Sequence, residues 1–384
     1  MNSRERIFKT IKKREIVDKI PWTFNYGDTQ GFNPKLLYNF KKTFGINKPL
    51  REYFDYDIYT VLDPEIIYPI DKYINSPINK GETLLTSGIK FISNGIDPGK
   101  YFENIPPDAY LDAWGIMHIP SKTDPTFEIY KSPLEKVNSL KEIKNYPIPE
   151  IDNESFSIAM DDVKKIKNNN KMSVIYSGSI FEWVWNLRGQ EKFYLDLYDN
   201  IEVIYLLIQK VKEFTLKLSL KAVEIGVDIL SFYDDFGMQT GLQISKKHWI
   251  QIIKPAWKEI IEKILGVNKD VIIFLHSDGK IDDIIPDLIE IGVDVLHPIQ
   301  PETMNVFEIS KKYHKYISFW GMFSAQKTMP FGTKEAIENE IKELILKVGK
   351  NGSFILSPSN IMGPEVPLSN IKYFETFAKK YCSI

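Results

Sequence analysis

The sequence predicts an α/β protein whose parallel strands close into a (β/α)8 barrel of the TIM type. Eight short runs rich in apolar or β-branched residues alternate with segments of helical periodicity along the 384 residues. Runs without a polar face suit parallel strands that helices cover on the outside. Glycine closes several helices just before the next strand, at Gly226, Gly292 and Gly349, where a left-handed backbone ends the helix.

The predicted elements alternate along the chain. The strands are residues 20–26, 56–62, 173–177, 228–233, 271–276, 293–297, 317–321 and 353–357. The helices include residues 192–226, 246–265, 281–291, 306–312, 334–348 and 370–380. The order of strand, helix and strand with short returns is typical of a parallel sheet. Eight strands favour closure into a barrel, and an open doubly wound sheet is the structural alternative.

Residues 84–133 interrupt this alternation. The segment mixes short β-like pieces with Gly and Pro, which predicts a β-hairpin excursion. We expect it to fold over the mouth of the barrel, within a single domain that spans residues 1–384. No internal repeat is visible in the chain.

The composition excludes several classes of function. Hydrophobic residues make up 43% of the chain, enough for a large core, and the net charge of -2 gives no reason to expect nucleic acid or a membrane surface as partner. No apolar run approaches the roughly 18 residues of a membrane helix. The single cysteine, Cys382, excludes disulfides within the chain, and the N-terminus has no apolar signal segment, so we expect a cytoplasmic protein.

The best-marked candidate site follows the strand that ends in the sequence HSDG, which holds His276 and Asp278. The strand before it ends in Tyr233 and two carboxylates. In parallel α/β folds the chemistry lies in the loops after the strand ends. Paired carboxylates favour one protonated acid beside an ionised partner. The candidate catalytic residues are His276, Asp234, Asp235, Asp278 and Glu182.

Polar and aromatic side chains follow the other predicted strands as well. Together with the carboxylates and the imidazole they suit a flat organic substrate around which protons move. The candidate substrate-binding residues are Asn25, Tyr26, Tyr176, Phe181, Trp185, Tyr233, Trp320 and Asn360.

Each of these residues also has a structural explanation. Asp234 and Asp235 could be a helix cap and its solvated neighbour. His276 could be a core histidine bonded to backbone, and Asp278 could cap the next helix. His297, which precedes a proline, could have either a structural or a functional role. The hypothesis therefore depends on the set converging at one rim of the barrel.

Motifs for metals and nucleotides restrict the kinds of cofactor that the chain could bind. His276 and Asp278 place two ligand types on one loop, and Glu182, Asp234 or Asp235 could add the third ligand of a catalytic metal site. Neither GxGxxG nor GxxxxGK[ST] occurs, so no glycine-rich phosphate loop is expected. No serine occupies a GxSxG elbow.

Four segments, in order, resemble sequences of the uroporphyrinogen decarboxylase superfamily. They are YDDFGMQTGLQISKKHWIQIIKPAWKEII, FLHSDGKIDDIIPDLIEIGVDVLHPIQ, ISFWGMFSAQKTMPFGT and SFILSPSNIMGPEVPLSNI. The resemblance covers residues 173–380 well and extends more loosely to the N-terminal part. It implies a single (β/α)8 barrel with its cleft at the carboxyl ends of the strands.

The resemblance implies one of two activities, decarboxylation of a tetrapyrrole without a cofactor or corrinoid-dependent methyl transfer. The decarboxylase carries an arginine-rich loop of the form RQAGRY that holds the porphyrinogen carboxylates. The corresponding stretch here reads TFNYGDTQGF and contains no arginine. A substrate with many carboxylates needs cationic partners, so this departure argues against the tetrapyrrole.

The thiol-methylating branch of the superfamily holds zinc with a His-x-Cys motif after the fifth strand and a second Cys near the eighth. The matching positions here are His276 and Asp278, and the segment SPSNIMGP has no Cys. A Cys-ligated zinc is therefore not expected, whereas zinc or another metal with oxygen ligands at His276 and Asp278 stays open. The chain more closely resembles members that demethylate a substrate and load the corrinoid.

We therefore expect a methyltransferase that takes a methyl group from a small O-methyl donor, such as a methoxyaromatic compound, or from an N-methyl donor. The acceptor would be the cobalt of a corrinoid, a cobalamin, on a partner protein, because this chain lacks the DxHxxG signature of a cobalamin domain. The favoured acid is His276 with Asp234. A homodimer is compatible with the sequence. The alternatives are a decarboxylase of a small organic or pyrrolic acid and a non-catalytic small-molecule binding barrel.

Overall fold

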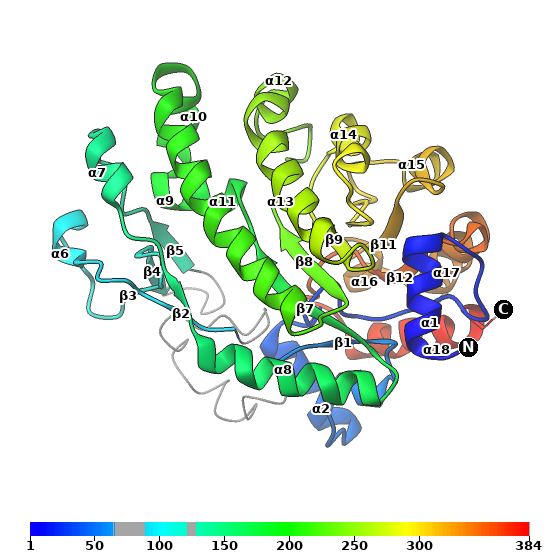
Figure 1. The fold of residues 1–384 in the computed structure, drawn as a ribbon. Helices are drawn as coiled ribbons and strands as arrows, with labels where there is room; N and C mark the ends of the chain where they lie inside the picture. The colour runs from blue at the N-terminus through cyan, green and yellow to red at the C-terminus, as the bar shows by residue number, and fades with distance from the viewer. Residues whose placement is uncertain (64, 66–88, 121–127, 384) are drawn as a thin grey trace.

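The computed structural model describes residues 1–63, 65, 89–120 and 128–383, and its centre is a seven-stranded sheet. The strands lie in the order β1-β7-β8-β9-β10-β11-β12, and all neighbours are parallel. The sheet curls, and helices surround its outer face (Figure 1). Its strands are β1 (Ile58–Thr60), β7 (Met172–Gly178), β8 (Ile229–Tyr233), β9 (Ile272–His276), β10 (Val295–His297), β11 (Ser318–Phe323) and β12 (Phe354–Pro358). The predicted TIM-like α/β class is confirmed.

The first predicted strand, residues 20–26, is wrong as a full strand. Its backbone forms one parallel bridge, between Trp22 and Leu356 of β12. The chain then turns, because the backbone groups of Tyr26 and Thr29 bond to each other at 3.1 and 2.9 Å. Those groups are no longer available for a ladder with β1. The described part of the sheet is thus a curled half-barrel whose eighth position is held by a single bridge.

The predicted helices are largely confirmed, with three changes, of which one is that residues 281–291 begin with a 3-10 turn, η3 (Asp282–Ile284). Residues 192–226 divide at Asn200, which takes non-helical angles (φ -144°, ψ 51°). Residues 246–265 contain a π-helical turn, η2 (Trp249–Ile253). The helices are α1 (Ser3–Phe8), α2 (Pro34–Phe44), α3 (Leu50–Tyr53), α6 (Pro98–Tyr101), α7 (Leu140–Asn145), α8 (Asn153–Asn168), α9 (Phe181–Arg188), α10 (Gln190–Asp199), α11 (Ile201–Glu224), α12 (Lys246–His248), α13 (Lys254–Val267), α14 (Ile285–Glu290), α15 (Val306–Tyr313), α16 (Thr328–Phe331), α17 (Lys334–Lys347) and α18 (Leu368–Tyr381). In the described part of the chain, none of them is both long and apolar enough for a membrane crossing.

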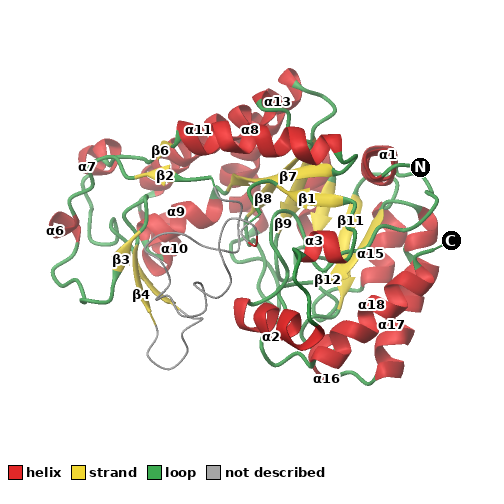
Figure 2. Ribbon diagram, turned by 90° about the horizontal axis from the view of Figure 1, so that it is seen from below, coloured by secondary structure: helices red, strands yellow, loops and turns green. Residues whose placement is uncertain are grey.

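The excursion at residues 84–133 is antiparallel where it is described, and three of its strands form one sheet. These are β3 (Tyr110–Leu111), β4 (Met117–Pro120) and β5 (Glu128–Lys131). A separate pair joins β2 (Phe91–Ile92) to β6 (Glu150–Ile151). Residues 84–88 and 121–127 lie outside the described part. Trp114 packs against Trp183 of α9 and Phe214 of α11 (ring centroids 4.8 and 4.9 Å), and Figure 2 shows β3 and β4 beside α9 and α10. That the excursion covers the mouth remains a prediction.

Apolar side chains fill the interior of the curled sheet. Each strand contributes residues that point inward, as the period of two in a strand requires. The N-terminal segment adds Ile7 of α1 and Ile11 of the π-helical turn that follows it, and both are fully buried. The interior set is Ile7, Ile11, Tyr26, Ile58, Met172, Val174, Ile229, Ile272, Phe274, Val295, Trp320 and Ile355. The start of the chain therefore closes one end of the barrel.

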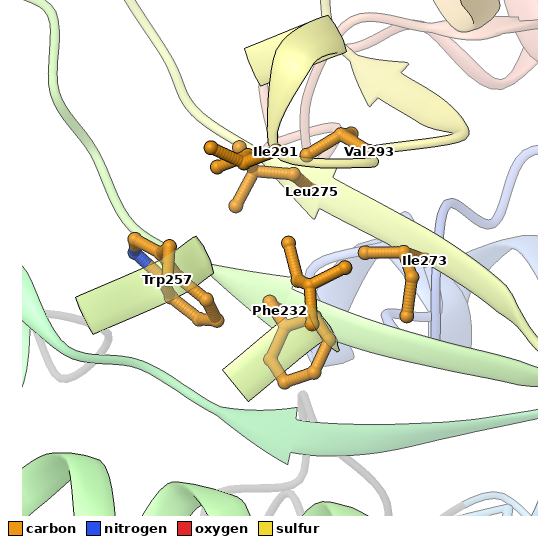
Figure 3. Close-up of a pocket in the computed structure, with 7 residues that line it drawn as sticks. Phe232, Trp257, Ile273, Leu275, Ile291 and Val293 are labelled. Atoms are coloured by element: carbon orange, nitrogen blue, oxygen red, sulfur yellow. The ribbon is translucent and has the colours of Figure 1, made fainter. Parts of the chain in front are cut away.

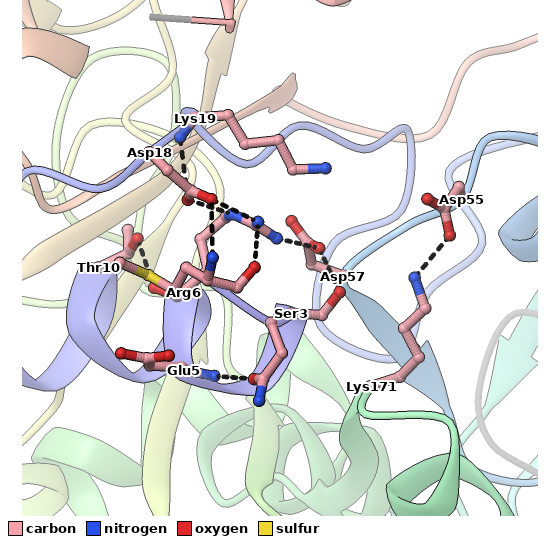
Figure 4. Close-up of polar contacts among 11 residues, drawn as sticks. Ser3, Glu5, Arg6, Thr10, Asp18, Lys19, Asp55, Asp57 and Lys171 are labelled. Carbon is pink, nitrogen blue, oxygen red and sulfur yellow. Dashed lines mark hydrogen bonds and ion pairs between the residues drawn. The ribbon is translucent and has the colours of Figure 1, made fainter.

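Ion pairs hold this N-terminal segment against the starts of the strands. Three basic side chains of the segment each meet an aspartate that directly precedes a strand. The pairs are Arg4–Asp228, Arg6–Asp57 and Lys12–Asp294, with N–O distances of 2.7, 2.7 and 2.6 Å. Figure 4 shows Arg6 between Asp57 and Asp18, with Ser3 also bonded to Asp57. The strand starts thus form a carboxylate rim that the N-terminal segment neutralises.

Two of these aspartates are the last residues of a five-residue sequence repeat. The string EIGVD occurs at residues 224–228 and again at residues 290–294. In both copies the glycine leaves a helix with positive φ, 83° at Gly226 and 98° at Gly292. The Oδ2 atom of each aspartate accepts the backbone N–H of the neighbouring strand, Ser173 and Ile273, at 2.9 Å. The expectation of no internal repeat was therefore wrong, and the repeat marks two equivalent entries into the sheet.

Replacing Arg6 by Ala should destabilise the protein by about 3 kcal/mol, because it leaves the buried carboxylate of Asp57 without its charge partner. Chemical unfolding monitored by circular dichroism measures this loss. The control is Lys9→Ala, which removes a solvent-screened pair with Glu5 and should leave the free energy of unfolding almost unchanged. Equal losses in the two variants would contradict a structural role for the ion pairs of the N-terminal segment.

Candidate active site

The carboxyl ends of β8 and β9 bring a histidine and two carboxylates together. His276 ends β9, Asp235 lies just after β8, and Asp278 lies in the loop after β9. The Nε2 atom of His276 is 3.6 Å from Oδ1 of Asp235 and 3.8 Å from Oδ2 of Asp278. The ligand atoms of these three residues lie within 4.8 Å of one another. The structure thus joins three of the five predicted catalytic residues in one cluster.

Hydrogen bonds fix the two carboxylates of this cluster. The backbone N–H of Asp278 donates to Oδ1 of Asp235 at 2.7 Å, and Nδ2 of Asn360 donates to Oδ2 of Asp278. The N–H of Gly279 donates to Oε1 of Gln300 at 2.9 Å. Gly279 has a φ of 81°, and a Cβ there would lie 2.5 Å from the backbone of Gly237. Glycine is therefore required where the two loops meet.

Burial and mutual repulsion make this a proton-holding site. Burial raises the pKa of Asp278 to about 6, with Asp235 adding to the rise and His276 opposing it. Burial, and then Asp235, Asp234 and Asp278, raise the pKa of Glu182 well above its usual range. The raised pKa favours the neutral form of Glu182, which can donate a proton.

His297, which was not among the predicted site residues, contacts the cluster directly. Its Nδ1 lies 2.8 Å from Nδ1 of His276. The ring of Tyr26 stacks on His297 at 4.0 Å with an interplanar angle of 9°, and on His276 at 5.3 Å. Burial and the neighbouring His276 hold the pKa of His297 well below its usual range. The only sequence signal was its position at the end of a predicted strand.

Tyrosines surround His276 on the side of β7 and β8. Tyr233 lies 5.1 Å from His276 and 5.6 Å from Tyr176, measured between ring centroids. The Tyr233 hydroxyl lies 2.7 Å from Oγ1 of Thr29. The hydroxyl of Tyr26 donates to Oδ1 of Asn360 at 3.1 Å. The structure therefore places Tyr26 and Tyr233 against His276, with Tyr176 and Asn360 in contact with these neighbours.

Other predicted binding residues lie deeper or carry no contact to the cluster. Phe181 is fully buried and packs against Phe236 with ring centroids 5.8 Å apart. Trp320 is fully buried inside the sheet, and its indole N–H donates to the backbone oxygen of Asn25 at 3.1 Å. The indole N–H of Trp185 has no hydrogen-bond partner among the described residues. Substrate binding by Phe181, Trp185, Trp320 and Asn25 stays a prediction.

Asp234 is fully buried and anchors the start of α9 to β8. Its carboxylate accepts from Oγ of Ser179, from the backbone N–H groups of Ile180, Phe181 and Glu182, and from Nε1 of Trp257. Burial raises the pKa of Asp234 to about 6, and the hydrogen bonds from Ser179, Glu182, Phe181 and Trp257 oppose this rise. With its oxygens engaged by these donors, Asp234 remains mostly ionised at pH 7 and holds Glu182 in place.

The same indole of Trp257 joins the site to the core. It lines a small apolar pocket between β8, β9 and α13 together with Phe232, Ile261, Ile273, Leu275, Ile291 and Val293 (Figure 3). The pocket has no polar lining and leaves no space for a water molecule. It is therefore a packing layer between sheet and helix, and the polar chemistry lies on the other side of Asp234.

Comparison with known proteins agrees with this architecture. Residues 113–381 match the model of the family described as "Uroporphyrinogen decarboxylase (URO-D)". The match spans well over half of the chain, so this protein belongs to the uroporphyrinogen decarboxylase family.

Two individual proteins show how far the likeness extends. The uroporphyrinogen decarboxylase of Hydrogenobaculum sp. (strain Y04AAS1) is 21% identical over 184 residues, which are 48% of this chain and 50% of the relative. The chain thus aligns with about half the length of that curated relative. A solved methyltransferase from Methanosarcina mazei superposes with a TM-score of 0.64 at 14% identity, covering 99% of each chain. That likeness extends the shared fold to the whole chain.

The bond from Trp257 to Asp234 can be tested with a matched pair of variants. Trp257→Phe removes a hydrogen bond to a charged group, which should cost about 2 kcal/mol beyond the loss of ring volume. Trp249→Phe is the control, since Trp249 is equally buried but its indole N–H has no hydrogen-bond partner among the described residues. Urea unfolding of both variants gives the difference, and a smaller loss for Trp257→Phe would refute the anchoring role.

Proposed function

We propose that the protein is a methyltransferase that moves a methyl group from a small O-methyl or N-methyl donor to the corrinoid of a partner protein. The observation that carries the proposal is the cluster of His276, Asp235 and Asp278 beside Tyr26 and Tyr233. Family membership and the full-length likeness to the Methanosarcina mazei methyltransferase support this class of reaction. The cobalt of the partner's corrinoid supplies the nucleophile that accepts the methyl group.

The loop that contributes Tyr26 favours this reading over tetrapyrrole decarboxylation. Tyr26 stacks on both histidines, so its loop borders the site. The stretch TFNYGDTQGF around it contains no arginine and no lysine. The described charges that act on Tyr26 are the carboxylates of Asp278, Asp235 and Asp28. A substrate with several carboxylates would meet like charge here, whereas a neutral methoxy compound or a methylated amine would not.

The residues around the donor would have distinct roles. An ether oxygen leaves only when it is protonated or bound to a Lewis acid. Glu182, whose pKa is raised by burial and by the nearby charges of Asp235, Asp234 and Asp278, would be the acid that supplies that proton. Tyr176 and Tyr233, which are only partly buried, would offer aromatic faces to a methoxylated ring, whereas Tyr26 already stacks on the two histidines. Asp234 would act as a positioning residue for Glu182 and not as the acid itself, because five donors engage its carboxylate.

The cluster also fits a divalent metal. Asp235, His276 and Asp278 would supply two oxygens and one nitrogen, the set of three ligands that a catalytic zinc needs. Their spacing of 3.6 and 3.8 Å suits atoms that each lie about 2 Å from one ion. Asn360 and the backbone N–H of Asp278 already orient the carboxylates. A metal held there supplies Lewis-acid activation of the leaving oxygen.

A methyl-transfer assay tests the proposal. The protein is mixed with a corrinoid protein in the cob(I)alamin state and a panel of methoxyarenes and methylamines, and the absorbance of methylated corrinoid is followed. His276→Ala should lower the rate at least about 100-fold, since it removes the centre of the cluster. The control is His314→Ala, because His314 lies at the end of α15, before β11 and thus on the opposite rim. The absence of methyl transfer from every donor would contradict the proposal. Release of carbon dioxide from a small acid would favour the decarboxylase alternative.

Metal analysis separates the two ways to activate the leaving group. The purified protein should bind one Zn²⁺ or Co²⁺ per chain in equilibrium dialysis. Removing a ligand by Asp235→Asn or His276→Ala should abolish this binding, while Glu182→Gln should leave the metal content unchanged and lower only the transfer rate. Metal content that is equal in wild type and His276→Ala would rule out this site.

A further inference from the structure

The register of the sheet places two histidines side by side at the rim. His276 of β9 and His297 of β10 are direct neighbours in the parallel ladder. Their Nδ1 atoms lie 2.8 Å apart, which is a hydrogen-bond distance. One of the two nitrogens must carry a proton and the other must accept it, because two lone pairs or two N–H groups at this distance would repel. The proton positions of the two rings are therefore linked.

The ring of His297 is fixed in this arrangement. Tyr26 stacks on one face at 4.0 Å, and the backbone of β11 lies close at Gly321, where a Cβ would approach the ring of His297 to 3.0 Å. His297 has no exposed surface, and its neighbours Tyr26, Phe274 and His276 carry no negative charge. The ring of His297 is thus held between Tyr26 and the backbone of β11, with its Nδ1 directed at Nδ1 of His276.

The second nitrogen of His276 faces a different environment. Its Nε2 points toward the carboxylates of Asp235 and Asp278. Binding of a metal ion at Nε2 requires a lone pair there, which puts the only ring proton of a neutral His276 on Nδ1. His297 must then accept that proton with its own Nδ1. The second histidine thus occupies the place that a carboxylate or carbonyl oxygen usually holds behind a metal-binding histidine.

We propose that His297 is a positioning residue, which accepts the Nδ1 proton of His276 and so presents the bare Nε2 of His276 to a divalent cation held with Asp235 and Asp278. This inference rests on the proposed metal-binding role of His276. It does not depend on the identity of the methyl donor. It also gives a function to the aromatic stack, since Tyr26 holds both imidazoles in one orientation.

Two substitutions separate positioning from packing. His297→Leu fills most of the space but offers no acceptor, and His297→Asn places its Oδ1 where Nδ1 of the histidine lies. Zn²⁺ binding is measured by isothermal titration calorimetry on full-length protein, with no methyl donor present. We expect His297→Leu to bind Zn²⁺ about 10- to 100-fold more weakly than wild type and His297→Asn to restore most of the affinity. Equal affinity for His297→Leu and wild type, or equal loss in both variants, would overturn the inference.

A spectroscopic measurement on the wild type keeps the inference testable if a variant fails to fold. The chain has five histidines, so selective ¹⁵N labelling of histidine gives few ring signals, and His276→Gln identifies those of His276. In the Zn²⁺-loaded protein we expect a protonated Nδ1 and an unprotonated Nε2 on His276. The opposite tautomer, or no Zn²⁺ binding by the wild type, would refute the positioning role. Methyl transfer through Glu182 would remain separately measurable in either case.

Discussion

The carboxylate of Asp234 is the interaction on which the catalytic rim depends. It is fully buried, and it ties the end of β8 to the first turn of α9 and to Trp257 of α13. A buried charge is stable only when several donors satisfy it, so these three elements are held in one relative position. Asp235 is the next residue in the chain, and the backbone of Glu182 is one of the donors. The positions of Asp235 and Glu182 therefore depend on a carboxylate that is itself fully buried.

Much of the fold and part of the site could be predicted from sequence alone. Carboxyl ends of adjacent parallel strands meet at one edge, so Asp235, His276 and Asp278 were expected near one another, and they are. The contact between His276 and His297 could not be foreseen, because it depends on the ladder register that pairs these two residues. Alternation of apolar residues gives the existence of a strand but not its alignment with the next one.

Two other departures have local causes. The segment at residues 20–26 has the composition of a strand, yet the turn that joins Tyr26 to Thr29 diverts its backbone hydrogen bonds. The EIGVD repeat could not be recognised from sequence alone, because a five-residue match at a spacing of 66 positions can arise by chance. Its equivalence follows from the fold, in which both aspartates accept a strand N–H in the same way. Asp234 was expected among the acids because it follows a predicted strand beside a second carboxylate. Its hydrogen-bond donors before and within α9 and on α13 could not be predicted, because only the folded chain brings them together.

The N-terminal segment has a consequence for how reactants reach the rim. Ile7 and Ile11 close the barrel from beneath, and apolar side chains fill the space above them. Among the described residues this end of the sheet is thus filled, and His276 lies at the opposite side, at the carboxyl ends of the strands. If a large carrier protein settles over that side, a small molecule underneath can neither arrive nor escape. The kinetics of such a pair would be ordered, with the small reactant first on and last off.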